Sequence, residues 1–340
     1  MLRRFGLMLI LSLHCSACSA NWGEVEASSN DEMAERQAID KAVVAAIERR
    51  DYVALNAMAA DYRTKRSRTP SGTWKLSIYY GALFFYLPEV RSSPNCPQPD
   101  DGFVDAWIAA HPAEPAALIA KARLLYGYAF CLRGSASASR TTGSQMTGFQ
   151  EQINRAISMF EKHRDVASTD PQFYAESIRL HGAGGLGRAI IPAILDEGTG
   201  KEPYFYETYF AANDYYRPRW WGLPGDQIKL ARLAAGNTSQ DGNGSYARVI
   251  WYLDEIDNLP RAEIDWPLMV EAMEDVVEKY PTDWNHANFG RLACKLGDYA
   301  TAKRHLLAVV SDDSAAWKSE EEREFCLKTK RFVSPGALKP

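Results

Sequence analysis

The chain has 340 residues, 46% of them hydrophobic and 24% charged, and its formal net charge is −4. This size and apolar fraction allow a substantial core and exclude an intrinsically disordered chain, while the ordinary glycine and proline content excludes a collagen-like one. Because positive and negative charges nearly balance, the chain has no electrostatic footprint for nucleic acid, and we expect no nucleic-acid partner.

The first 20 residues have the composition of a bacterial export signal. Two arginines precede an apolar core over residues 5–13, and small residues follow over 16–20. The core is too short to span a bilayer. The segment that ends at Cys18 resembles a lipoprotein box, which would place a lipid on Cys18; ordinary cleavage after Ala20 is the alternative. We therefore expect an exported, periplasmic protein whose contact with a membrane, the outer one, is made through an N-terminal lipid.

The body of the chain is predicted to be helical from its start. Ser29 and Glu32 form a capping box, and apolar residues continue at helical spacing through Ile47. Asp51 is placed to cap a second helix. Two segments rich in small polar residues, 134–148 and 236–245, are expected to be loops.

The segment over 182–187 has the sequence GAGGLG, which satisfies the spacing of a dinucleotide-binding motif. Such a site needs a strand before the glycines, whereas residues 171–181 have a helical pattern. We therefore interpret the glycines as a turn between helices and predict no nucleotide cofactor.

Half of the residues over 204–221 are aromatic, and we call this segment the aromatic belt. Tyrosine and tryptophan rings can fill the space between helices or line a groove for a ligand, and core packing is the favoured interpretation for most of the belt. Arginine is rarely buried without a partner, so the arginines beside Pro218 are harder to explain as core. The candidate ligand-binding residues are Tyr209, Arg217, Arg219, Trp220 and Trp221.

The C-terminal part repeats the helical design. Residues 284–310 resemble a tetratricopeptide unit, in which Gly290 and Ala302 are small enough for two helices to approach closely and Gly297-Asp298 forms the turn. The segment that begins at Asp51 resembles the same turn. A regular repeat length is absent. We predict an all-α, irregular tetratricopeptide-like (α-solenoid-like) array of helical hairpins, single over residues 29–326, with a C-terminal tail over 327–340.

Two further segments carry a wider resemblance. These are TPSGTWKL over residues 69–76 and YYRPRWWGLPGD over residues 215–226. With the last hairpin, they resemble an uncharacterised family of exported bacterial proteins that is tetratricopeptide-like in pattern. The resemblance extends over most of the chain and implies the fold and the compartment, but no activity.

Four cysteines lie beyond the export signal, at Cys96, Cys131, Cys294 and Cys326. An even number in an exported protein predicts two disulfides. In a stacked array each hairpin contacts its neighbours in sequence, so we expect Cys96 to pair with Cys131 and Cys294 with Cys326. No two of them have the CxxC spacing of a zinc or thiol-redox site.

No catalytic residue, metal ligand set or cofactor is predicted. His286 and His305 lie on adjacent helices of the last hairpin and could approach each other, but packing or solvent exposure is the favoured interpretation. The sequence favours a periplasmic module that binds or scaffolds a peptide or protein partner. The alternatives are a protective, immunity-type lipoprotein that blocks an incoming toxin and, less favoured, a hydrolase of envelope polymer with two carboxylates in a cleft.

Overall fold

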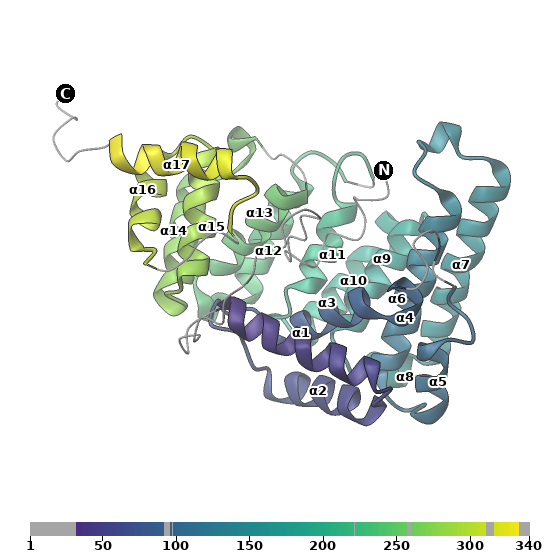
Figure 1. The fold of residues 1–340 in the computed structure, drawn as a ribbon. Helices are drawn as coiled ribbons and strands as arrows, with labels where there is room; N and C mark the ends of the chain where they lie inside the picture. The colour runs from purple at the N-terminus through teal and green to yellow at the C-terminus, as the bar shows by residue number, and fades with distance from the viewer. Residues whose placement is uncertain are drawn as a thin grey trace. The chain divides into compact units, whose positions relative to one another are not determined.

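The computed structural model describes residues 32–91, 96, 98–220, 222–256, 260–310 and 316–332. In these residues the fold is all-α, as predicted (Figure 1), and the only β-structure is an isolated antiparallel bridge between Arg68 and Trp74. The export signal with Cys18, the cap residue Ser29 and the belt residue Trp221 lie outside the described residues, as does the end of the tail, 333–340. Among the described helices, none is both long and apolar enough to cross a membrane.

The chain divides into two compact units. Among the described residues, the first contains Glu35–Thr69 and Thr73–Pro224, and the second contains residues 32–34 at the start of the first helix, Pro70–Gly72 and the chain from Gly225 onward. The boundary therefore falls inside the YYRPRWWGLPGD segment. The single array over 29–326 stays a prediction.

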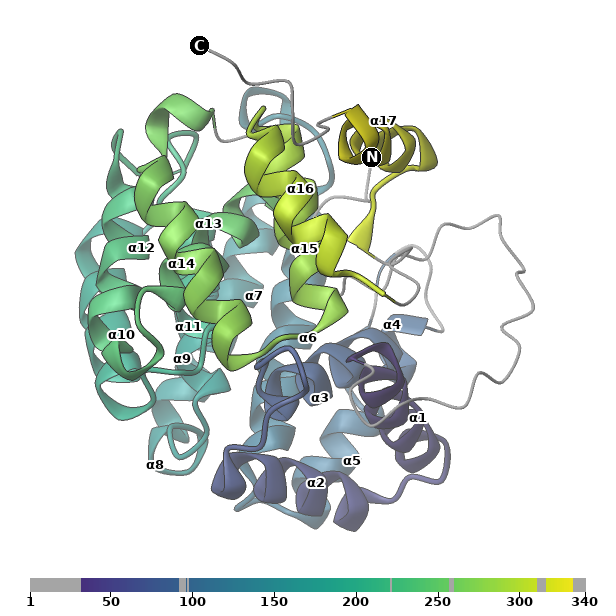
Figure 2. The same cartoon turned by 90° about the vertical axis from the view of Figure 1, so that its left-hand side faces the viewer.

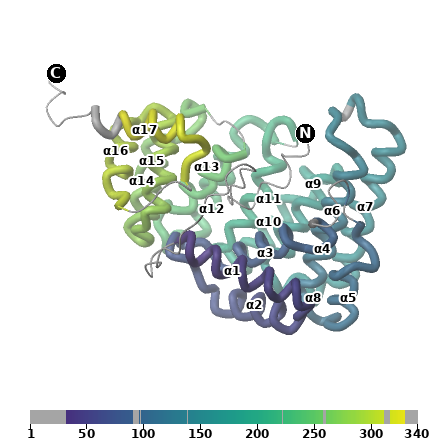
Figure 3. The backbone as a smooth tube through the Cα atoms, viewed as in Figure 1, coloured from purple at the N-terminus to yellow at the C-terminus, as the bar shows by residue number. Residues whose placement is uncertain are grey.

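The first unit is built from helices joined by short turns. Its longest pair, α6 and α7, lie side by side (Figure 3), and α9 packs against both α10 and α11. The helices are α1 (Glu32–Glu48), α2 (Tyr52–Lys65), α3 (Lys75–Tyr86), α4 (Pro88–Arg91), α5 (Phe103–Ala110), α6 (Pro115–Arg133), α7 (Gly143–Lys162), α8 (Arg164–Ala167), α9 (Gln172–Ala183), α10 (Gly187–Lys201) and α11 (Glu207–Tyr215).

The prediction of loops over 134–148 and 236–245 is wrong for residues 143–148 of the first segment and for both ends of the second, which are helical. Thr142 forms a capping box with Gln145, since each side chain bonds the other residue's backbone N–H, and α7 begins at Gly143. In the second segment, residues 236–237 end the preceding helix, a 3₁₀ turn η3 (Ser239–Asp241) follows, and the next helix begins at Gly244. Small polar residues suit helix caps as well as loops, which explains the error.

The glycine-rich segment over 182–187 is the predicted turn between two helices. Gly185 has φ +85°, and α9 rather than a strand precedes the turn. A Cβ on Gly182 would lie 2.5 Å from the ring of Tyr215. The first glycine therefore makes room for an aromatic side chain in the core.

The second unit contains the predicted tetratricopeptide-like hairpin, whose helices α15 and α16 lie side by side (Figure 2). A Cβ on Gly290 would lie 2.6 Å from Leu306, Gly297 has φ +79°, and Asp298 accepts a hydrogen bond from the Thr301 backbone N–H at 3.0 Å. The helices are α12 (Asp226–Asn237), α13 (Gly244–Ile256), α14 (Trp266–Lys279), α15 (Asp283–Lys295), α16 (Tyr299–Ala308) and α17 (Glu320–Phe332), with a 3₁₀ turn η4 (Arg261–Glu263).

Both predicted disulfides are present. Cys96 pairs with Cys131 across a Cα–Cα distance of 5.5 Å, and Cys294 pairs with Cys326 across 5.9 Å. The first ties the segment before α5 to the end of α6, and the second ties α15 to α17. Structural disulfides of this kind are typical of an oxidising, non-cytoplasmic compartment.

Candidate functional site

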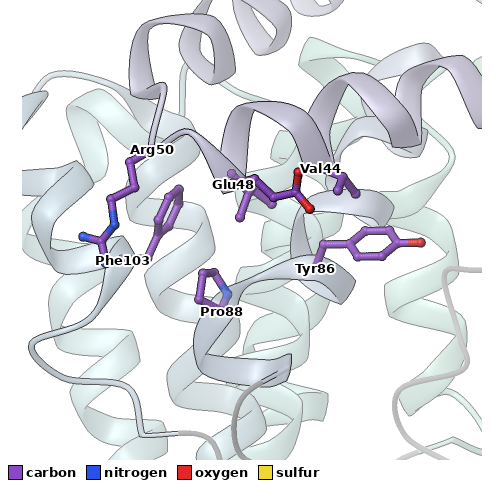
Figure 4. A pocket seen from close by; sticks show the side chains of 7 residues that line it. Val44, Glu48, Arg50, Tyr86, Pro88 and Phe103 are labelled. Atoms are coloured by element: carbon purple, nitrogen blue, oxygen red, sulfur yellow. The ribbon is translucent and has the colours of Figure 1, made fainter.

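A pocket of about 420 Å³ opens in the first unit, where the end of α1 meets the end of α3, α4 and the start of α5 (Figure 4). Its volume falls within the roughly 300–1,000 Å³ that is usual for ligand sites. It is lined by Val44, Ile47, Glu48, Arg50, Tyr86, Pro88 and Phe103.

The base of the pocket is apolar and firmly held. Phe103 is buried and packs edge-on against Tyr52, with ring centroids 5.1 Å apart. Tyr52 in turn stacks on Trp107 at 6.2 Å, and the Trp107 indole N–H donates a hydrogen bond to Asn56 at 2.9 Å. Because these rings are locked by one another, the pocket has a preformed base rather than one that must order on binding.

The rim carries one charge of each sign. Glu48 and Arg50 are both exposed. Neither side chain makes a hydrogen bond or ion pair with another described residue. Figure 4 shows the two side chains on either side of Phe103. An apolar base between an unpaired carboxylate and an unpaired guanidinium can take an apolar group that has charged groups beside it.

The backbone at Arg50 is strained. Its φ is +51°, in the left-handed region that costs an L-residue about 1–2 kcal/mol. The equivalent position of the last hairpin is Gly297, where that conformation is free of strain. Strain of this kind concentrates at binding and catalytic sites.

The residues that the sequence analysis proposed lie elsewhere. Tyr209 is fully buried and Arg217 nearly so, with the Arg217 Nε donating to the Asp214 carbonyl at 3.1 Å; that these two bind a ligand stays a prediction, which their burial does not favour. Arg219 is exposed, and Trp220 is half-buried against Tyr215, with ring centroids 6.0 Å apart. None of the four lines the pocket.

Four of the nine aromatic residues of the belt are buried in the core, as the favoured interpretation expects; Tyr204, Phe210, Tyr216 and Trp220 are half-buried, and Trp221 lies outside the described residues. Phe205, Tyr206 and Tyr215 are buried, and Tyr126 and Tyr215 share a hydrogen bond at 3.1 Å between their hydroxyl groups.

The pocket residues gave one weak sequence signal. A bulky residue stands at position 50, directly before the cap Asp51, where a glycine would be expected.

A buried charged cluster joins α9 to α11. Arg179 donates to Glu176 at 2.8 Å and lies 3.8 Å from Glu207. Burial raises the pKa of Glu207 to about 7, and the nearby guanidinium of Arg179 opposes the shift. Both carboxylates lie in the core, so their contribution is to hold two helices together rather than to face a ligand.

The two histidines of the last hairpin approach each other, and His305 is also packed in the core, which agrees with the favoured interpretation of packing. The Nδ1 atoms of His286 and His305 are 3.1 Å apart. His305 is buried and His286 is half-buried. Within the described part of the chain, no group of three or more His, Cys, Asp or Glu side chains is arranged to hold a metal ion.

Comparisons with known proteins give no relative: no family model matches the chain, and no curated protein or solved structure is similar to it.

Proposed function

We propose that this protein is an exported helical-hairpin module that binds a peptide or protein partner, rather than an enzyme, and that the pocket at the end of α1 is its binding site. The observation that carries the proposal is Arg50, which holds a strained backbone conformation at the rim of the pocket and has no partner for its charge among the residues that the structure describes. A residue whose backbone conformation costs stability and whose side chain bonds no other described residue is explained by a role in binding.

The chemistry of the pocket favours a peptide segment. The apolar lining, which includes Val44 and Phe103, would accept an aliphatic or aromatic side chain. Arg50 would pair with a carboxylate of the partner, and Glu48 with an amino or guanidinium group. Peptides offer all three groups within a few residues, and helical-hairpin arrays commonly bind such segments.

We further propose that the protein is periplasmic and held at the outer membrane by a lipid on Cys18. The disulfides support export, and the residues before Cys18 support lipid attachment. Cys18→Ser should move the protein from the membrane fraction to the soluble periplasmic fraction, because a multiply acylated N-terminus anchors firmly whereas a bare one does not. Unchanged fractionation, with a mature N-terminus at Asn21, would contradict the anchor.

Site-specific photo-crosslinking in intact cells tests the binding site. A benzophenone side chain at Val44, which lines the pocket, should form an adduct with a partner, whereas one at Lys41, exposed on the same helix, should not. In that background Arg50→Gly should abolish the adduct. Arg49→Ala removes an equal charge from the neighbouring position and should leave the adduct intact. Equal adducts from positions 44 and 41, or an adduct that survives Arg50→Gly, would overturn the proposal.

A further inference from the structure

The histidine pair of the last hairpin joins α15 to α16 by a hydrogen bond between like groups. The two Nδ1 atoms lie 3.1 Å apart, which is hydrogen-bond distance. One nitrogen must donate its proton and the other must accept it, since an imidazole nitrogen that carries a proton cannot accept. The contact therefore holds one proton between two nitrogens.

The surroundings of His305 assign the roles. Its Nε2 is buried without a hydrogen-bond partner and lies 3.8 Å from Oε1 of Glu274 on α14. A proton on Nε2 would point into the field of that carboxylate, which leaves Nδ1 of His305 unprotonated. His305 is then the acceptor and His286 the donor. The ring of His305 also contacts that of Phe289 edge to face, with ring centroids 5.9 Å apart.

Protonation of His305 in acid would break the hydrogen bond between the two histidines. A second proton, on Nδ1 of His305, would face the N–H of His286 across the same 3.1 Å, so the bond would be replaced by the repulsion of two donors. His305 is 1% exposed, and water cannot solvate the new charge while α16 stays in place.

Charged groups around the pair raise the pKa of one histidine and lower that of the other. Glu274 and Asp283 raise the pKa of His286, but burial outweighs them and lowers it. For His305, burial lowers the pKa to about 3, and His286 and Arg304 act in the same direction. Glu274 is itself held by Arg304 at 2.7 Å.

Several charged groups on the remaining neighbouring helices have partners of their own. On α13, Asp254 pairs with Lys295 at 2.7 Å. On α17, Glu322 lies 3.6 Å from Arg291, and Glu320 pairs with Arg323 at 3.0 Å. None of these pairs supplies a charge that would replace the proton in the histidine contact.

We propose that the His286–His305 pair is an acid-sensitive latch, which holds α16 against α15 at neutral pH and releases it in acid. The release is local, because the Cys294–Cys326 disulfide keeps α17 attached to α15 whatever the state of the histidines. The inference rests on the geometry of the hairpin and does not depend on the pocket of the first unit.

Hydrogen exchange of the full-length, oxidised protein tests the latch. After correction for the intrinsic pH dependence of exchange, the opening equilibrium of α16 amides should rise roughly 30-fold at about 1.5 pH units below the ordinary histidine pKa of 6.5. The opening equilibrium of α6 and α7 amides in the first unit should not rise in acid. His305→Phe keeps an aromatic ring against Phe289 without a titrating group, and it should remove the acid response.

Two further variants keep the result decisive. If His305→Phe does not fold, His286→Gln is used instead: it removes the second imidazole while an amide can still donate to His305, and the acid response should shrink. His111→Asn, in the first unit, should leave the response of α16 unchanged. The proposal would be overturned if α16 amides were equally protected at neutral pH and in acid, or if the acid response were undiminished in His305→Phe or His286→Gln. Zinc binding by the pair, measured by calorimetry at neutral pH, would also overturn it.

Discussion

Two turns of the same design carry different residues, which makes the strain at Arg50 measurable. In the first hairpin the Asp51 N–H donates to the Ala46 carbonyl at 2.8 Å, and in the last hairpin the Asp298 N–H donates to the Ala293 carbonyl at 2.9 Å. Each aspartate then caps the next helix through its side chain. The residue before each aspartate has a positive φ.

We predict that Arg50→Gly stabilises the protein. The left-handed conformation costs an L-residue about 1–2 kcal/mol, and the greater freedom of glycine in the unfolded chain offsets about 0.4–1 kcal/mol of that. The net gain should be about 0.5–1 kcal/mol. By the same arithmetic Gly297→Ala should lose about 0.5–1 kcal/mol. Arg50→Ala is the control, since it removes the charge but keeps the strain, and its stability should stay within about 0.5 kcal/mol of the original.

Urea unfolding followed by far-ultraviolet circular dichroism measures these changes. Transitions are fitted separately if the two units unfold apart, because a single free energy is defined only for a two-state transition. A loss of stability in Arg50→Gly comparable to that in Gly297→Ala would refute the reasoning, because Arg50 would then owe its conformation to a favourable contact of its side chain.

Three other predictions concern the disulfide, a buried acid and the exposed arginine. Replacing Cys294 and Cys326 by serine should cost roughly 3–4 kcal/mol, since the bridge closes a 32-residue loop, and α17 amides should lose protection first in hydrogen exchange. The folded-state pKa of Glu207 is raised from 4.5 to about 7, so its contribution to stability is complete below pH 4.5 and is lost as pH rises through 7, by up to roughly 3 kcal/mol. Glu207→Gln should remove this pH dependence from the unfolding free energy measured in urea. An unchanged pH dependence would assign it to another group. Arg219→Ala should change the unfolding free energy by less than about 0.5 kcal/mol, because Arg219 is exposed. Arg217→Ala empties a buried position and should lower the unfolding free energy clearly more. Equal effects would contradict the difference in burial.

The sequence was sufficient wherever a local pattern decides the structure. Asp51 and Asp298 indicate where helices begin, because the aspartate side chain accepts a hydrogen bond from the backbone N–H three residues later. The disulfide pairing could be predicted because helical hairpins contact their sequence neighbours.

The candidate site could not be predicted, since its parts come from separate elements. The pocket forms only where Glu48, Tyr86 and Phe103, far apart in sequence, are brought together by the packing of α1, α3 and α5. The same limit applied to the aromatic belt: composition showed that it was unusual, but burial alone distinguishes Tyr209 in the core from Arg219 at the surface.

The order of the disulfides along the chain has a consequence for how the protein acquires them. Each bridge joins a cysteine to the next one in sequence, with separations of 35 and 32 residues. A chain that enters an oxidising compartment N-terminus first would expose Cys96 and Cys131 before Cys294 arrives. Oxidation of thiols in the order of their emergence then gives the native connectivity directly, and maturation should require an oxidant but no isomerase that rearranges mispaired bridges.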